Sequence, residues 1–349
     1  MTPKIQTLIE TLAATHSLPQ SAYQALIEAH DSETAQFAAQ LARQAANQAY
    51  GKTVFIRGLI EISNICKNDC LYCGIRRGNG ACSRYRLTPE EILDCTKEGY
   101  ALGFRTFVMQ GGEDGWFTDE VLCEIIRKIK AQHPDCAITL SLGERSAASY
   151  EKLRAAGADR YLLRHETADP VHYQALHPHE MSFAHRMDCL NTLKHLGFQT
   201  GCGFMVGSPH QTTAHIANDL KFIETFRPHM CGIGPFIPHI DTPFRNEPAG
   251  SADLTCFLLS LVRLIHPNIL LPATTALGSV EANGRERGIL SGANVIMPNL
   301  SPVNVRDKYM LYNNKLSSGP EAAQNLKELR DRMAAIGYEI VVDRGDSKQ

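Results

Sequence analysis

The sequence predicts an α/β fold, a (β/α)8 TIM-type barrel with a helical extension before it and a short helix and strand after it. Three observations lead to this expectation. Eight short β-rich segments recur along the chain, a helical pattern separates each from the next, and the turns between helix and strand share an Ala/Gly signature, as in "AAGAD", "HLGFQ" and "LSGAN". Repeated units of this kind pair as parallel strands through right-handed crossovers. A doubly wound open sheet is the alternative, but the chain offers no long connection that would reverse the sheet order.

The individual elements follow from local patterns. Strands are expected at 53–63, 104–110, 136–143, 158–166, 198–207, 229–237, 268–275 and 293–299. Helices are expected at 88–103, 118–132, 147–156, 182–196, 212–226, 253–265 and 280–290. The helix at 88–103 has a clear start, with Thr88 as N-cap, Pro89 at the first helical position and Glu91 completing a capping box.

Three regions are expected along the chain. Residues 1–50 carry only helical patterns and predict an N-terminal extension. Residues 51–310 contain the eight β/α units of the barrel, and 311–349 predict one helix and one strand packed on it. In such barrels the active site lies at the carboxyl ends of the strands. Polar or Gly/Pro-rich segments follow nearly every predicted strand, so we expect the site at that face.

The composition narrows the class of protein. The 349 residues carry a formal charge of −2, with 44% hydrophobic and 21% charged residues, which predicts a well-filled core. Nothing in this balance indicates a nucleic-acid or membrane partner. No apolar run approaches the ~20 residues of a membrane span, and the N-terminal segment lacks a signal-peptide core. We therefore expect a cytoplasmic protein.

The 11 cysteines are an odd number in a long chain, which argues against a disulfide framework. Six are interpreted as small buried hydrophobic residues, namely Cys123, Cys136, Cys189, Cys202, Cys231 and Cys256. Cys66, Cys70 and Cys73 instead form a C-x3-C-x2-C cluster. Three thiolates would bind a four-iron cluster and leave one iron open. A zinc site with Cys82 as fourth ligand is the alternative, but the x3 spacing is atypical of zinc.

This cysteine spacing, with Tyr72 before the last cysteine and the whole motif just after the first strand, resembles the radical S-adenosylmethionine (SAM) superfamily. The resemblance implies that Cys66, Cys70 and Cys73 hold one [4Fe-4S] cluster whose open iron chelates SAM. It implies reductive cleavage of SAM to a 5′-deoxyadenosyl radical. The reductant would be an electron carrier such as ferredoxin or flavodoxin.

Further residues are similar to the SAM-binding elements of that superfamily. The "GGED" segment resembles its Gly-Gly-Glu motif, which implies that Gly111, Gly112 and Glu113 bind the ammonium group of SAM. A tight Gly-Gly turn without a ligand is the alternative. The ribose hydroxyls and the carboxylate are expected to meet Ser141, Glu166 and Arg186, because carboxylates accept hydroxyl protons and guanidinium groups pair with carboxylates.

Several long stretches are similar to the [FeFe]-hydrogenase maturase HydE family: "RYRLTPEEI", "LSLGE", "GADRYLLRHET", "GIGPFIPHIDTP", "PATTALG" and "GANVIMPN". The resemblance implies a role in assembling the two-iron subcluster of the hydrogenase H-cluster. The radical would attack an iron complex with carbonyl, cyanide and cysteine ligands. The partner maturases HydG and HydF would act before and after this protein. Another radical SAM enzyme of the biotin synthase or methylornithine synthase group, acting on a small organic substrate, is the alternative, and a non-enzymatic scaffold is a further one.

The resemblance also implies a set of residues that line the reaction cavity: Arg160, Arg164, Met230, Thr274, Thr275, Met297 and Tyr309. Arginines suit an anionic complex, and a dry interior protects a radical. Ordinary core filling is the alternative for the two methionines. One departure from the family stands out, because no cysteine follows Cys256, whereas some members bind an auxiliary cluster through C-terminal cysteines. We therefore expect a single cluster.

Overall fold

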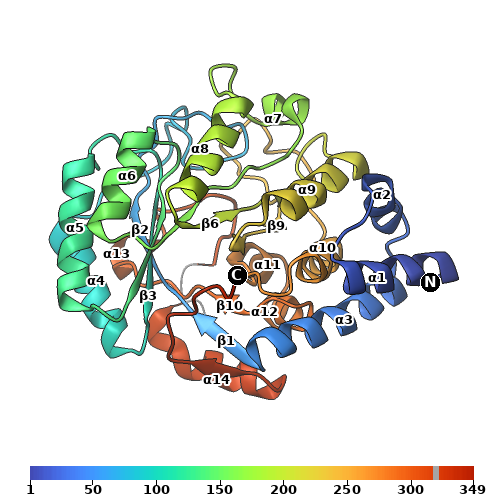
Figure 1. Cartoon of the computed structure of the whole chain (residues 1–349). Coiled ribbons are helices and arrows are strands. Elements are labelled where there is room, and N and C mark those ends of the chain that lie inside the picture. Colours follow the sequence, from blue (N-terminus) through green and yellow to red (C-terminus); the bar gives the residue numbers. More distant parts are fainter. Residues whose placement is uncertain (317–321) are drawn as a thin grey trace.

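Parallel strands close into a barrel at the centre of the molecule, as the sequence predicts. In the computed structural model, which describes residues 1–316 and 322–349, six strands pair in the order β2-β3-β4-β5-β6-β8, and β10 pairs with β1. Single parallel bridges complete the ring, at Met230–Leu270, Pro272–Val295 and Leu59–Asn299. Figure 1 shows the helices arranged around these strands.

The strands are β1 (Thr53–Ile56), β2 (Gly58–Ser63), β3 (Thr106–Gly111), β4 (Ala137–Ser141), β5 (Arg160–Leu162), β6 (Gln199–Cys202), β7 (Met205–Val206), β8 (Met230–Cys231), β9 (Gly234–Pro235), β10 (Val295–Ile296) and β11 (Glu339–Val341). The helices are α1 (Pro3–Thr15), α2 (Gln20–Glu28), α3 (Ser32–Tyr50), α4 (Pro89–Ala101), α5 (Asp119–Gln132), α6 (Ala147–Ala156), α7 (Pro170–Leu176), α8 (Phe183–His195), α9 (Thr213–Phe226), α10 (Ala252–Ile265), α11 (Thr275–Val280), α12 (Gly284–Leu290), α13 (Val303–Arg306) and α14 (Leu326–Ala335), with a 3-10 turn at Ala323–Asn325.

Most of these elements begin and end within a few residues of the bounds that the sequence predicts. The capping box of Thr88 and Glu91 starts α4 as predicted. The segment 268–275 is shorter than expected and joins the barrel only through its single bridges. The helix expected at 280–290 is present as α12, and a further short helix, α11, precedes it. Helix α7 was not predicted, although Asp169 caps it and Pro170 occupies its first position.

The N-terminal helices pack beside α9 and α10 at one side of the barrel, as Figure 1 shows. Helix α10 is buried on nearly all of its surface, because it lies between these helices and the barrel. Its neighbour α3 presents a row of alanines, Ala38, Ala42 and Ala46, that are all buried. Small side chains allow two helices to approach closely. The boundaries of the three expected regions remain a prediction.

The C-terminal segment closes the amino end of the barrel. Strand β11 pairs with β1 outside the ring, and the C-terminus lies at the centre of the view in Figure 1. There Arg160, fully buried at the start of β5, forms an ion pair with Asp346 at 2.6 Å and donates to the Arg344 carbonyl at 2.8 Å. Arg160 therefore lies at the end of the strand opposite to the cysteine loop, and the expectation that it lines the cavity with Arg164 is not supported.

Candidate functional site

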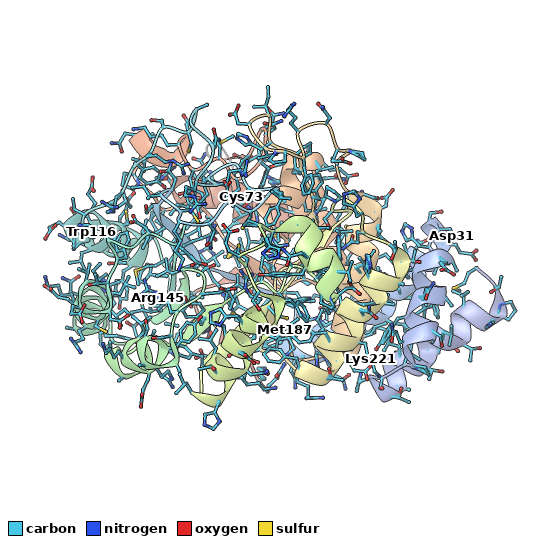
Figure 2. The ribbon with its side chains drawn as sticks, turned by 90° about the horizontal axis from the view of Figure 1, so that it is seen from above. Asp31, Cys73, Trp116, Arg145, Met187 and Lys221 are labelled. Carbon is cyan, nitrogen blue, oxygen red and sulfur yellow. The ribbon has the colours of Figure 1, made fainter. Side chains whose placement is uncertain are left out.

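The cysteine loop connects β2 to α4 at the carboxyl end of the barrel. Its fold depends on Arg84, whose guanidinium donates to the carbonyl oxygens of Asn64 (2.6 Å), Ile75 (2.8 Å), Arg76 (2.6 Å) and Asn79 (3.2 Å). One planar side chain with several N–H donors thus binds the backbone before and after the three cysteines. In Figure 2, Cys73 lies near the middle of the molecule, and Asp31, just before α3, lies at its right-hand side.

The three predicted ligands are partly exposed, whereas seven other cysteines are buried. Burial raises the pKa of the Cys66 and Cys70 thiols and raises that of Cys73 to about 12, and the sulfur atoms are close enough to influence one another. Thiolates at these positions therefore need the positive charge of bound iron. Within the described residues, no three His, Cys, Asp or Glu side chains converge on a single metal-ion position. A cubane takes each thiolate on a different iron.

The Gly-Gly-Glu segment ends β3 and packs directly on the cysteine loop. The Gly112 N–H donates to the Ser63 carbonyl at 3.0 Å, and the Glu113 N–H points to Cys66 Sγ at 3.4 Å. A Cβ atom at Gly112 would lie 2.3 Å from the Ile65 oxygen, so only glycine fits there. The neighbouring Gly111 is less crowded, with 3.2 Å to the nearest atom.

Glu113 is held on both sides of its carboxylate. Oε1 accepts the Glu144 N–H at 3.0 Å, and Oε2 pairs with Lys67 Nζ at 2.9 Å. The Lys67 N–H also donates to the Glu113 carbonyl at 3.0 Å. These bonds join the ends of β3 and β4 to the cysteine loop and fix the carboxylate beside Cys66.

Arg186 of α8 and Glu166, which follows β5, both lie near the cysteine loop. Arg186 Nε pairs with Glu144 at 2.6 Å, and its Nη1 donates to the Arg164 carbonyl at 2.6 Å. Burial alone would lower the pKa of Arg186, but Tyr173 and Glu144 raise it overall, so the guanidinium stays charged. Glu166 is buried, and its negative charge raises the pKa values of Cys70 and Cys73. The structure thus brings both residues to the cysteine loop.

Arg164 and Glu166 have polar atoms that the described part of the protein does not satisfy. Arg164 Nη2 lies 3.5 Å from Glu166 Oε2, and neither atom has a hydrogen-bond partner there; Arg164 Nε also lacks one. Buried polar atoms without partners cost free energy. Two such groups beside three thiols fit a polar ligand that supplies the missing partners.

Tyr72 links the loop to α7. Its hydroxyl lies 3.2 Å from His177 Nε2, and His177 Nδ1 lies 2.8 Å from the Tyr173 carbonyl. Because Nδ1 must donate to that carbonyl, Nε2 is the acceptor for the Tyr72 hydroxyl. The Leu71 N–H donates to the Leu176 carbonyl at 3.0 Å, so α7 supports the loop through backbone as well as side chain.

The predicted cavity residues separate into two groups. Tyr309 is buried beside the strand ends, and Gln110 Nε2 donates to its hydroxyl at 3.4 Å. Ser141 lies at the same level, next to Gln110 in the register of β3 and β4. Met230 and Met297 instead pack in a small apolar cluster with Tyr50, Phe55, Leu270 and Val295.

The two threonines already take part in local structure. Thr274 caps α11 and accepts the Leu277 N–H, and the Thr275 hydroxyl accepts from Arg285 at 3.2 Å. Their proposed contact with substrate remains a prediction.

A buried ion pair between Glu61 and Lys315 was missed by the sequence reasoning. Lys315 Nζ lies 2.5 Å from Glu61 Oε1 and 5.1 Å from the centre of the Tyr309 ring, and Asn299 donates to Glu61 Oε2 at 2.9 Å. A carboxylate inside the apolar strand "GLIEIS" was a signal that a partner must lie within the barrel. Nothing in the sequence around Lys315 identifies it as that partner.

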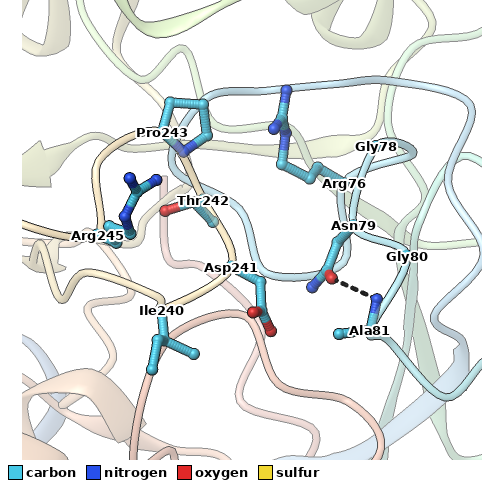
Figure 3. Close-up of a pocket in the computed structure, with 10 residues that line it drawn as sticks. All are labelled: Arg76, Gly78, Asn79, Gly80, Ala81, Ile240, Asp241, Thr242, Pro243 and Arg245. Carbon is cyan, nitrogen blue, oxygen red and sulfur yellow. Dashed lines mark hydrogen bonds between the residues drawn. The ribbon is translucent and has the colours of Figure 1, made fainter.

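A surface pocket of about 470 Å³ adjoins the cysteine loop. Figure 3 shows it between residues 76–81 of the loop and residues 240–245, with Arg76 and Arg245 at its walls. None of the predicted SAM-binding residues lines it. This pocket is therefore separate from the cluster and SAM site.

Comparisons with known proteins identify the family of this chain. Residues 60–223 match the radical SAM superfamily. The chain is 48% identical over 266 residues to the [FeFe] hydrogenase maturase subunit HydE of Thermotoga maritima, covering 76% of each chain. It is 26% identical over 295 residues to 3-methylornithine synthase of Methanosarcina acetivorans, covering 84% of this chain and 82% of that one.

Solved structures share the fold. Methylornithine synthase aligns with a TM-score of 0.81 at 23% identity over 96% of this chain and 97% of its own. The maturase HydG of Carboxydothermus hydrogenoformans aligns with a TM-score of 0.79 at 21% identity over 96% of this chain and 78% of its own. Both families have this barrel, but the sequence identity of the chain to HydE is much higher than its identity to methylornithine synthase. The chain is a radical SAM enzyme and belongs to the HydE family of [FeFe] hydrogenase maturases.

Proposed function

We propose that this protein acts in assembly of the two-iron subcluster of the [FeFe]-hydrogenase H-cluster. Its substrate would be a small organometallic, an iron complex with carbonyl, cyanide and cysteine ligands supplied by HydG, and its product would pass toward HydF. One observation carries the proposal: three thiols and the unsatisfied polar atoms of Arg164 and Glu166 lie together at the carboxyl end of the barrel of a HydE-family chain.

Cys66, Cys70 and Cys73 would hold the [4Fe-4S] cluster, with one iron left for SAM. Glu113, fixed by Lys67 and the Glu144 N–H, would meet the SAM ammonium group. When bound, the cluster would supply the one electron that cleaves SAM into methionine and a 5′-deoxyadenosyl radical.

Other residues would bind the remaining parts of SAM. Glu166 would accept hydrogen bonds from the ribose hydroxyls, since its Oε2 has no hydrogen-bond partner among the described residues. Arg186 would face the SAM carboxylate, and Ser141 would lie beside the ribose.

The chain's residues also exclude water from the cavity. The segment 309–316 crosses toward the cysteine loop, where Gly74 N–H donates to the Leu311 carbonyl at 2.8 Å. Lys315 reaches from this segment to Glu61 inside the barrel. Water exclusion strengthens electrostatic contacts and limits side reactions of a radical.

A single cluster is part of this proposal. Its support is that no cysteine follows Cys256 in the sequence, and that the cysteines outside the loop are buried in the core. Cys82 is partly exposed and accepts a weak contact from Asn64 Nδ2 at 3.6 Å. Iron and sulfide analysis tests this directly, because one cluster gives about four of each per chain.

We also propose reduction by a carrier such as ferredoxin or flavodoxin. Residues 64–86 carry five basic residues and one acidic residue, which suits an acidic partner. Arg77 is exposed in this segment. Arg77→Glu should slow reduction by flavodoxin and leave reduction by dithionite unchanged; equal slowing with both reductants would contradict this.

The cytoplasm is the proposed location, because the cysteines of the described residues are free thiols and form no disulfides. Among the described residues, none of the helices combines the length and apolar character that a membrane span requires.

The test of the proposed function is SAM cleavage under anaerobic conditions. Reconstituted protein with dithionite and SAM should form 5′-deoxyadenosine faster when the HydG product is added. Formation that does not respond to the HydG product would contradict the proposed substrate.

A further inference from the structure

His165 and Asp219 form a buried pair that the proposed function does not use. Both side chains are fully buried, and His165 Nε2 lies 3.3 Å from Asp219 Oδ1. His165 is the middle residue of the "RHE" stretch between the site residues Arg164 and Glu166, whereas Asp219 belongs to α9. Two ionisable groups kept away from water are costly unless they are well partnered.

The pair belongs to a continuous chain of hydrogen bonds. The Gly203 N–H donates to His165 Nδ1 at 3.2 Å, so the ring proton must sit on Nε2 and point to Asp219. Asp219 Oδ1 also accepts the Ala168 N–H at 2.6 Å. The Gly203 carbonyl in turn accepts the Glu166 N–H at 3.0 Å. The backbone on both sides of Glu166 is therefore attached to α9 and to the end of β6.

This attachment holds a strained residue. Glu166 has a φ of 65°, in the left-handed region that side-chain-bearing residues rarely adopt. Such a conformation is unfavourable and persists only when surrounding contacts impose it.

We propose that Asp219, acting through His165, is a positioning residue that holds Glu166 in the left-handed conformation in which it receives the ribose of SAM. This inference rests on the proposed function, because the contact between Glu166 and ribose is part of it. The pair also packs within an apolar shell, with the His165 ring 4.7 Å from the Phe222 ring and 5.9 Å from that of Phe204. A role in stability alone would not depend on the ribose, and this difference makes the proposal testable.

The test compares three variants of the reconstituted enzyme. Asp219→Leu removes both hydrogen bonds to the carboxylate at similar volume, whereas Asp219→Asn keeps a carbonyl acceptor for Ala168 and His165. His165→Phe keeps an aromatic ring of similar volume but removes the hydrogen bonds of His165, and it replaces Asp219→Leu in the test if that variant does not fold. We expect Asp219→Leu and His165→Phe to weaken SAM binding about tenfold, the upper range for the loss of one ordinary hydrogen bond. Asp219→Asn should stay within about twofold of the wild type.

Two further measurements separate positioning from stability. Free methionine carries the amino and carboxylate groups of SAM but no ribose, so its affinity should not change in any variant. In a double-mutant cycle, Glu166→Gln combined with Asp219→Leu should bind SAM no worse than Glu166→Gln alone. Equal losses for methionine and SAM, or additive losses in the cycle, would overturn the positioning role.

The failure of the proposed ribose contact would look different. In that case Glu166→Gln would leave SAM affinity unchanged. Amide hydrogen exchange of the Glu166 N–H, which donates to the Gly203 carbonyl and not to Asp219, then tests the positioning claim by itself in the SAM-free enzyme. Faster exchange in Asp219→Leu than in Asp219→Asn supports it, and equal exchange in the two variants overturns it.

Discussion

Adding one methyl group at Gly112 should displace the cysteine loop. A Cβ atom there would lie 2.3 Å from the Ile65 carbonyl oxygen and 2.8 Å from Cys66 Cβ, and both belong to the loop. Ordinary contact begins near 3.4 Å, so loop and strand end must separate by about 1 Å. Neither neighbour is the flexible end of a side chain, so the backbone itself has to move.

The expected cost of Gly112→Ala follows from this displacement. Forcing extra volume into packed structure costs about 1–3 kcal/mol of the free energy of unfolding. A 1 Å misplacement of reacting groups can reduce turnover about a hundredfold. We expect the variant to fold, to bind less iron and sulfide per chain, and to cleave SAM about a hundredfold more slowly.

Gly115→Ala is the matched control, since no atom lies within 4 Å of the Cβ it would add. Urea unfolding, iron and sulfide content, and the rate of SAM cleavage should be measured on both variants. Full iron content and a wild-type rate of SAM cleavage in Gly112→Ala, with Gly115→Ala also unchanged, would refute the reasoning that this glycine is required by the close approach of the loop.

Three other predictions concern ligands, a buried charge and pH. Cys73→Ala should lose the cluster and all SAM cleavage, whereas Cys82→Ala should keep the iron content of the wild type; full iron content in Cys73→Ala would contradict the ligand assignment. Lys315→Met leaves the fully buried carboxylate of Glu61 unpaired and should lower the free energy of unfolding by about 3–5 kcal/mol. Adding Glu61→Gln to that variant should recover most of the loss, and urea titrations of the wild type and the two variants test this. Burial lowers the pKa of His266 to about 4. As pH falls below about 6.5, the unfolded chain therefore binds a proton at this residue before the folded protein does. The free energy of unfolding decreases between pH 6.5 and 4, by about 2 kcal/mol at pH 5. In His266→Gln, the free energy of unfolding should therefore fall less between pH 7 and 5 than in the wild type. An equal fall in the two proteins would contradict this prediction.

Much of the fold was predictable because its signals are local. The capping box at Thr88, the Ala/Gly turns before strands and the spacing of apolar residues each act within a few positions. The same reasoning located the cysteine loop and the Gly-Gly-Glu turn at one end of the barrel. Helix α7 was missed even though Asp169 and Pro170 signal its start, because its 7 residues give only about two turns of periodic pattern.

The missing parts depend on contacts between distant residues. Glu61 and Lys315 are 254 positions apart, and His165 and Asp219 are 54 apart. No spacing rule pairs such residues. Arg160 was misplaced for a related reason: it and Arg164 both belong to the predicted fourth strand, but the strand direction carries Arg160 to the opposite end, where the C-terminal segment binds it.

The central claim is tested most directly by an anaerobic maturation assay. Apo-hydrogenase, HydG, HydF, SAM and reductant are combined with wild-type protein, with Cys73→Ala, or with neither, and hydrogen evolution and 5′-deoxyadenosine are followed. The account predicts hydrogen evolution that requires the wild-type protein and is lost with Cys73→Ala. Deoxyadenosine without hydrogen, from brown protein that binds SAM and in an assay where HydE of Thermotoga maritima restores hydrogen evolution, would contradict the maturase role.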